Sequence, residues 1–467
     1  MSRPGYVIKP KEPTVLAGQS EYVLDGNDLM ISTRVDTSHI VPGPIDLERF
    51  NDALARTLSV FPTHAGRLQR PSDGKGHWKA SIYYILLTND GVPVTVVERD
   101  DRTEVPSDSI VQSPWTLTNG VNIVKYLDYG LTEPVMNVTI IRFTKTGSTS
   151  IGLSAMHFMG DGFVILHFAR TLSQYYQGLE LLDPPPSYNH ERVSLESVDT
   201  TAYAGMPFPG VKHVYSMRET MPHNKPGRIV PVQLTLRIEG SQIKQAHAVA
   251  QAQIREKDPT AFLSRQDVLV ALLVYSLSHA EPDISPIQSI TSLTRGMAST
   301  PSHTIGNALL WIPTEPARDF VSETIATIAL RVRQSLAKAR DPGYITAFNA
   351  VHAQKLEAIG NAELGRDLIM RPGDMVINST WKFDWTSAHF GYPGQTRFYH
   401  TLINGPRFVK FFRPNPTLLP DGTWKPSSPD DVEINLFLPN EVKERFKEII
   451  SQEVKNLGVV GSIDFIE

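Results

Sequence analysis

The sequence predicts an α/β protein of two domains, each a mixed sheet flanked by helices, and three observations lead to this class. The chain has 467 residues, more than the roughly 250–300 over which a single hydrophobic core keeps growing. In its first part, β-rich runs alternate with two amphipathic segments, 45–61 and 163–176. A stretch rich in Pro, Gly and Ser then interrupts the pattern. We therefore expect domains at 1–185 and 227–467, joined by a long crossover at 186–226.

The elements of the first half follow from periodicity and turn chemistry. Pro44 precedes the helix expected at 45–61, and acidic side chains occupy its opening turn, where they favour the helix dipole. Residues 134–143 and 150–156 each have the composition of a strand, and the polar turn between them makes the pair a hairpin. Apolar periodicity then resumes and predicts the second helix, at 163–176.

The most informative residues lie where the second strand of this hairpin gives way to helix. His157 ends the strand, Asp161 lies four residues further on, and Gly162 follows it. A histidine at a strand end is held by the sheet while its ring faces a cleft, which suits proton transfer. Asp161 offers a charge that can pair with an arginine inside the fold, and Gly162 tolerates a positive φ. The pattern predicts a catalytic base, with a core histidine bonded to a backbone carbonyl as the alternative.

The second half is expected to open with a strand at 229–238 and a helix at 241–256. Ser264 and Asp267 then form a capping-box-like start to a further apolar helix, 268–278. The free N–H groups at such a helix N-terminus can also bind a phosphate. The crossover before these elements is too long for a hairpin and is expected on the surface, although a disordered linker is the alternative.

The His157 turn and several other segments of the chain resemble a known family. The strand, the H-x-x-x-D-G turn and the following helix resemble the BAHD acyltransferases, a branch of the chloramphenicol acetyltransferase-like superfamily. Further stretches similar to the family lie along nearly the whole chain: 50–62, 65–68, 263–269, 306–308, 432–439 and Phe446. The resemblance implies two chloramphenicol acetyltransferase-like domains. It also implies acyl-CoA as a co-substrate, with acetyl-CoA as the default donor, and no permanently bound cofactor. Because the region near Ser264 lies near coenzyme A in the family, Ser264 and Arg295 are expected to contact its phosphates.

One segment departs from the family pattern. The usual D-F-G-W-G is H-F-G-Y-P at 389–393, so the ion pair that its acid makes with an arginine in the family cannot form in the usual way. Residues 378–381 resemble the family's T-S-W segment facing the site. Thr380 and Trp381 are therefore candidates to stabilise charge on the thioester oxygen, with Gly391 supplying backbone access. Core packing is the alternative for Trp381.

Composition excludes several other classes. The net charge is −4 with acids and bases interspersed, so the electrostatic signature of a nucleic-acid or anionic-lipid partner is absent. No apolar run approaches the roughly 18 residues that span a bilayer, and the start lacks a signal-like stretch. The absence of cysteine excludes disulfides, thiolate zinc sites and a cysteine nucleophile. The 14 histidines lack metal-ligand spacing, so no metal is expected. We expect a cytoplasmic monomer.

The resemblance implies an acyl-CoA-dependent O-acyltransferase acting on a small metabolite, with an amine acceptor left open. An alcohol attacks a thioester slowly unless a base takes its proton, and neutral His157 is suited to do so. Without an enzyme nucleophile, both substrates must be bound together in a ternary complex. Two alternatives remain. A carrier-protein-dependent condensation-type enzyme is disfavoured because Met156 replaces its usual second histidine, whereas the altered segment 389–393 favours a non-catalytic binding relative.

Overall fold

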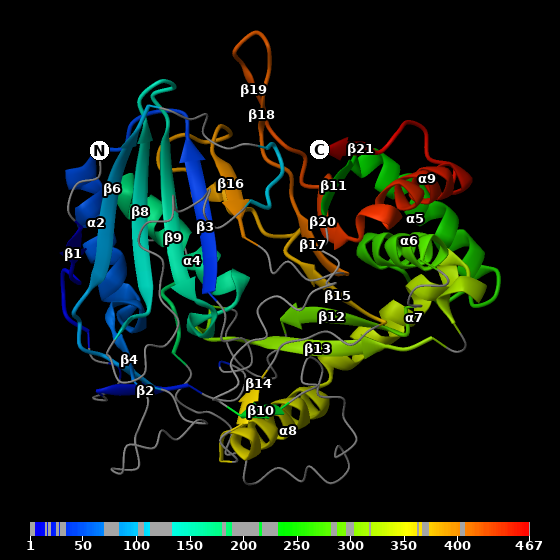
Figure 1. The fold of residues 1–467 in the computed structure, drawn as a ribbon, viewed down its shortest axis with the longest axis horizontal. Coiled ribbons are helices and arrows are strands. Elements are labelled where there is room, and N and C mark those ends of the chain that lie inside the picture. Colours follow the sequence, from blue (N-terminus) through cyan, green and yellow to red (C-terminus); the bar gives the residue numbers. More distant parts are fainter. Residues whose placement is uncertain are drawn as a thin grey trace.

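The computed structural model of the protein contains two large sheets. It describes the following residues: 5–14, 16, 20–24, 28, 34–69, 84–100, 107–112, 133–179, 184–188, 214–216, 232–281, 287–295, 303–316, 319–361, 364–366, 373–401 and 407–466. Figure 1 shows the two sheets side by side, with the first half of the chain in blue to cyan and the second in green to red. The expected α/β class, with two sheet-rich halves flanked by helices, is confirmed.

The first sheet has six strands in the order β1-β6-β8-β9-β3-β16. Their bounds are β1 (Tyr6–Ile8), β6 (Val92–Arg99), β8 (Met136–Phe143), β9 (Thr149–Met156), β3 (Arg34–Val41) and β16 (Arg397–His400). Two helices, α2 (Leu47–Val60) and α4 (Gly162–Tyr176), pack against it. The shared core includes Phe50 and Leu54 of α2, Phe168 of α4 and Ile140 of β8. The predicted hairpin is confirmed, since β8 pairs with β9 in antiparallel register.

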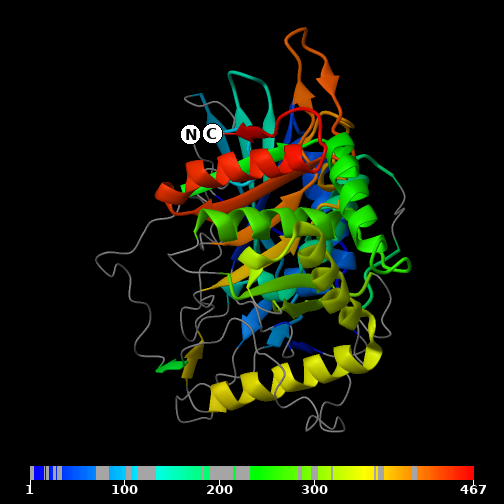
Figure 2. The same ribbon diagram turned by 90° about the vertical axis from the view of Figure 1, so that its right-hand side faces the viewer.

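The second sheet has seven strands in the order β13-β12-β15-β17-β20-β11-β21. Their bounds are β13 (Leu309–Thr314), β12 (Ser289–Arg295), β15 (Asp374–Ser379), β17 (Phe408–Phe412), β20 (Val432–Leu438), β11 (Val232–Ile238) and β21 (Asp464–Ile466). The helices that share its core are α5 (Gly240–Arg255), α6 (Arg265–Ala280), α7 (Ile325–Ala337) and α9 (Asn440–Asn456). Figure 2 views the molecule from the side of these helices. Helix α6 is buried nearly all round, as its continuous apolar sequence requires.

The remaining elements are short or lie apart from the main sheets. A four-stranded sheet contains β2 (Glu21–Val23), β5 (Tyr84–Leu86), β4 (Arg67–Gln69) and β7 (Glu133–Pro134). Two hydrogen-bonded pairs are β10 (Val214–Ser216) with β14 (Leu364–Arg366), and β18 (Thr417–Leu418) with β19 (Trp424–Lys425). Helix α8 (Pro342–Asn361) lies beside the first of these pairs (Figure 1). The 3₁₀ turns are η1 (Pro62–Ala65), η2 (His157–Met159), η5 (Phe320–Ser322), η6 (Lys338–Arg340) and η7 (Trp385–Ser387).

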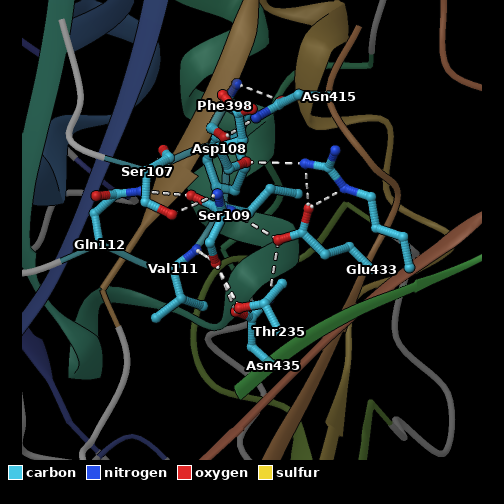
Figure 3. A network of polar contacts seen from close by, with 12 residues as sticks. Ser107, Asp108, Ser109, Val111, Gln112, Thr235, Phe398, Asn415, Glu433 and Asn435 are labelled. Atoms are coloured by element: carbon cyan, nitrogen blue, oxygen red, sulfur yellow. Dashed lines mark hydrogen bonds and ion pairs between the residues drawn. The ribbon is translucent and has the colours of Figure 1, made fainter. Parts of the chain in front are cut away.

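The two halves of the chain are interlocked. Strand β16 comes from the second half but pairs with β3 of the first sheet. In the opposite direction, residues 107–112 of the first half lie against the second sheet, as Figure 3 shows. There the Ser109 hydroxyl lies 2.8 Å from Asn435 Oδ1, and the Ile110 amide donates to the fully buried Glu433 carboxylate at 2.7 Å. The sequence did not predict either exchange.

The predicted helices are present, with ends shifted by a few residues. Helix α6 begins at Arg265 rather than at 268, because its capping box starts the helix before the apolar run does. Most of the crossover at 186–226 lies outside the described residues, so the domain boundaries stay a prediction. Within the described residues, no helix combines the length and apolarity needed to cross a membrane.

Candidate active site

His157 lies at the end of β9, where the chain turns into η2 before α4. Its side chain is half-buried, and its Nδ1 atom is 3.2 Å from the Asn307 amide oxygen Oδ1. An amide oxygen can only accept a hydrogen bond, so this partner assigns the ring hydrogen to Nδ1. The other ring nitrogen, Nε2, then carries the lone pair, which is the arrangement a general base requires.

Hydrogen bonds to His157 and Asp28 hold Asn307 in place. Its Nδ2 group donates to the backbone oxygens of His157 and Asp28, at 3.0 and 3.1 Å, and its backbone amide donates to Asp28 Oδ1 at 2.9 Å. Because two carbonyls hold Nδ2, Oδ1 must face the imidazole. Our site prediction missed Asn307, although the Gly-Asn turn around it is part of the family resemblance. The preceding Gly306 has φ 109°, a backbone conformation that suits glycine.

Asp161 forms the ion pair that the sequence predicted, and its partner is Arg295 at the end of β12. The carboxylate is buried, caps α4 by accepting from the Phe163 amide at 3.0 Å, and also accepts from the Ala308 amide at 3.2 Å. Arg295 donates in addition to the Thr304 carbonyl at 2.8 Å. These contacts tie the turn after His157 to the second half of the chain. The contact between Arg295 and a coenzyme A phosphate stays a prediction. In this structure the Arg295 guanidinium is already bonded to Asp161 and to the Thr304 carbonyl.

The positive φ in this turn belongs to Gly160, and Gly162, which would tolerate one, does not adopt it. Gly160 has φ 156°, and a Cβ atom there would lie 2.4 Å from Cβ of Val164. Gly162 is instead the first residue of α4, because Asp161 acts as the N-cap. A Cβ atom on Gly162 would lie 3.5 Å from Cγ2 of Thr380, so the turn that contains Gly162 lies beside Thr380.

Thr380 and Trp381 lie close to this turn but have internal hydrogen-bond partners. The Thr380 hydroxyl donates to the Phe411 carbonyl at 3.2 Å and accepts from the Trp385 indole at 3.3 Å. The Trp381 indole donates to the Asp431 carbonyl at 2.6 Å, and its ring is buried in the core of the second half. The structure therefore shows packing roles for both side chains, and a contact with the thioester oxygen stays a prediction.

The altered segment 389–393 lies away from His157. The Phe390 amide donates to the Ser173 hydroxyl at 2.9 Å, near the C-terminal end of α4. Since His157 precedes the N-terminal end of this helix at Gly162 and the contact is at Ser173, about 17 Å of helix separates the two regions. The structure does not bring Gly391 together with His157. The Tyr392 hydroxyl donates to the Pro44 carbonyl at 3.2 Å, so neutral contacts hold a segment where the family has an acid.

Ser264 caps α6, as the sequence predicted. Its hydroxyl accepts from the Asp267 amide at 3.3 Å, and the Asp267 carboxylate accepts from the Ser264 amide at 2.7 Å. Arg333 also donates to this carboxylate, at 2.7 Å. The cap leaves the hydroxyl hydrogen of Ser264 available to a ligand, but a contact with coenzyme A stays a prediction.

Burial controls the charge at the site. It lowers the pKa of His157 to about 4; the positive charge of Lys410 acts in the same direction, and Asp161 opposes both. Lys410 on β17 is also buried, and its ammonium nitrogen lies 2.8 Å from Nε2 of His400 on β16. No motif in the sequence pointed to Lys410 or His400, since they are isolated residues of two strands that meet only in the folded protein.

Comparison with known structures shows the class of fold. The structure of TRI101 from F. graminearum, complexed with coenzyme A and deoxynivalenol, has a TM-score of 0.65 over 95% of this chain and 99% of that chain, at 15% identity. Vinorine synthase has a TM-score of 0.60 over 98% of both chains, at 14% identity. These likenesses establish a two-domain fold of the chloramphenicol acetyltransferase type. The X-domain from teicoplanin biosynthesis shares it more distantly, with a TM-score of 0.56.

The sequence comparison gives the family. The model of the Transferase family matches residues 7–452, so the chain belongs to this family, the BAHD acyltransferases. A hydroxycinnamoyltransferase of Narcissus pseudonarcissus is 28% identical over 187 residues, 38% of this chain and 40% of that protein. The acetyltransferase adrJ of Penicillium roqueforti is 31% identical over 122 residues, 24% of each protein. The matches thus span less than half the length of these relatives.

Proposed function

We propose that the protein is an acyl-CoA-dependent O-acyltransferase that acylates a hydroxyl group of a small metabolite, with His157 as the general base. The observation that carries this proposal is the fixed imidazole of His157. Its Nδ1 faces Asn307, which leaves Nε2 as the basic atom. The TRI101 structure of the same fold is a complex with coenzyme A, which supports the choice of co-substrate.

The reaction needs a single proton to move twice. Nε2 of His157 takes the hydroxyl proton as the acceptor oxygen attacks the thioester carbon. Collapse of the tetrahedral intermediate breaks the carbon–sulfur bond, and the imidazolium returns the proton to the thiolate, which gives an ester and free coenzyme A. Asp161 and Arg295 hold the turn that carries the base, and Ser264 is a candidate contact for a coenzyme A phosphate. Acetyl is the first donor to test, and the hydroxycinnamoyl group in the names of several relatives is the second.

The test measures release of free thiol. Purified protein is incubated with acetyl-CoA or p-coumaroyl-CoA and a panel of hydroxylated metabolites, and the absence of cysteine keeps the background low. His157→Ala is expected to reduce turnover by a factor of about 10²–10⁴, the contribution of a positioned base. His279→Ala is the matched control, because this imidazole stacks on Tyr275 near the end of α6. A wild-type rate in the His157 variant would refute the proposal.

Two other functions make different predictions in the same assay. A non-catalytic binding relative would bind a CoA ester in calorimetry but release no thiol with any acceptor. A condensation-type enzyme would require the acyl group on a carrier protein, and Met156 occupies the place of the second histidine that such domains usually carry. We expect the protein to be a cytoplasmic monomer, and light scattering tests its oligomeric state.

A further inference from the structure

A buried lysine lies where the two sheets meet. Lys410 belongs to β17 of the second sheet, and only 6% of its surface is exposed. Its ammonium nitrogen lies 2.8 Å from Nε2 of His400, which belongs to β16 of the first sheet, and 5.4 Å from the ring centre of Phe412. In the part of the chain that the structure describes, Lys410 has no carboxylate partner.

Two other cations of the protein, the buried Arg407 and the partly exposed Arg237, are paired with carboxylates. Arg407 pairs with Glu281 at 2.6 Å, and Arg237 pairs with Glu433 at 3.0 Å. Burying a charged group without an opposite charge costs roughly several kcal/mol of folding free energy. Buried ionisable groups are therefore paired with an opposite charge, or their pKa shifts toward the neutral form. Burial lowers the pKa of Lys410 to about 7. His400 supplies a lone pair but no negative charge, since burial and then Lys410 lower its own pKa well below the usual value.

The ammonium group also acts electrostatically on the proposed base. Its charge is the second cause of the lowered pKa of His157, after burial. An ammonium group has three N–H donors, and His400 takes one of them. The other two donors have no hydrogen-bond partner among the residues that the structure describes. Carboxylates suit this position because charge-assisted hydrogen bonds to an ammonium group are short and strong.

We propose that Lys410, oriented by His400, binds a carboxylate of the acceptor, so that the acceptor is a hydroxy acid. This inference rests on the proposed acyltransferase function and adds the chemical class of its acceptor. The bound anion supplies the countercharge that the described residues do not. It also orients the acceptor, because a carboxylate fixed at Lys410 leaves the hydroxyl a limited set of positions relative to Nε2 of His157.

The experiment compares hydroxy acids with their methyl esters. Shikimate, 3-hydroxybenzoate and 4-hydroxyphenyllactate are each paired with the corresponding ester, and thiol release gives kcat and KM for wild type, Lys410→Met and Lys410→Arg. Where neither the acid nor its ester is a substrate, the rise in Tm that each compound causes in the presence of coenzyme A compares their binding. Lys410→Met is expected to lower kcat/KM for the acid by about 10–100-fold, the value of a lost hydrogen bond to a charged group, and to leave the ester nearly unchanged. Lys410→Arg keeps the charge and should retain part of the preference for the acid.

Three results would overturn this assignment. Equal losses for acid and ester would indicate that Lys410 stabilises the oxygen of the thioester instead. An unchanged Lys410→Met enzyme would indicate a structural amine. Failure of every acid to bind or react better than its ester in wild type would exclude a carboxylate site. Turnover of the esters that depends on His157 would, in that last case, leave the acyltransferase function standing. Unligated Lys410→Met should be at least as stable as wild type, because a buried charge is removed.

Discussion

The protonation state of His157 is set by its surroundings rather than by its sequence neighbours. Burial and the charge of Lys410 lower its pKa to about 4, compared with about 6.5 for a free imidazole. A base acts only when it is unprotonated, so the lowered pKa keeps His157 competent at neutral pH and well below it. The same shift makes the imidazolium short-lived, which favours return of the proton to the leaving thiolate.

The pH dependence of kcat/KM tests this shift. Because the active form is neutral, activity is lost as pH falls through the pKa of the folded enzyme. We expect a flat profile from about pH 8 down to pH 5.5, with the acid limb near pH 4 rather than near the unperturbed value of about 6.5. Lys410→Met removes the second cause of the shift, so its acid limb should move upward. A wild-type limb near pH 6.5 would contradict the burial argument.

Asn307 is a positioning residue whose removal should impair catalysis more than binding. Asn307→Ala frees the imidazole to rotate, and we expect kcat to fall about 10–100-fold, the usual effect of losing an orienting partner. The KM for acyl-CoA should change little. Asn307→Asp places a negative charge beside Nδ1, which raises the pKa of His157 and moves the acid limb upward. An unchanged kcat in Asn307→Ala would contradict the positioning role, and an acid limb that does not move in Asn307→Asp would contradict the contact with Nδ1.

At the scale of elements, the turn between β9 and α4 depends on a strand from the other half of the chain. Asp161 caps α4 and pairs with Arg295 of β12, and its carboxylate is 3% exposed while the arginine side chain is 20% exposed. The element that carries the base is thus held at its start by the second sheet. Gly160 contributes by allowing the close approach of Val164, which a Cβ atom would prevent.

Asp161→Asn should therefore destabilise the protein strongly. The substitution leaves Arg295 without its countercharge, and breaking a buried pair in this way costs about 3–5 kcal/mol, with the lower end expected because the arginine is partly exposed. Asp52→Asn is the control, since Asp52 pairs with Lys11 on the surface and such pairs contribute about 0–1 kcal/mol. Urea unfolding measures both variants. Equal unfolding midpoints for Asp161→Asn and Asp52→Asn would show that the buried pair stabilises the protein no more than the surface pair.

At the scale of the whole molecule, the two halves exchange segments and cannot be separated without breaking sheet contacts. Strand β16 completes the first sheet. Residues 107–112 are held on the second sheet by hydrogen bonds from Ser109 to Asn435 and from the Ile110 amide to Glu433 (Figure 3). Glu433 is fully buried and also accepts from Arg237 at 3.0 Å. This mutual exchange makes the stability of each half depend on the other.

We expect calorimetry to show one cooperative unfolding transition for the two halves. Glu433→Gln removes the countercharge of Arg237 and weakens the anchor of Ile110, so it should lower Tm while the transition stays single. Glu444→Gln is a control on the surface, where its partner is Lys447 and Tm should not change. Two separate transitions in wild type would mean that the exchanged segments do not couple the halves.

The local structure and the centre of the site can be predicted from the amino-acid sequence alone. The hairpin of β8 and β9, the capped helices α4 and α6, and the His157 turn depend on periodicity, capping and turn residues within a few positions of each other. The resemblance to the BAHD family rests on the same short patterns, and the match over residues 7–452 confirmed it. Such signals are readable in one chain because each residue's partner is close in sequence.

The distant residues that meet at that centre become known only from the folded chain. Asn307 reaches His157 across 150 positions, and Arg295 reaches Asp161 across 134. Periodicity shows which face of a strand is buried but not which strand lies beside it, so the pairing of β16 with β3 could not be read from the sequence. For the same reason, Lys410 and His400 looked like ordinary strand residues until the fold brought them together.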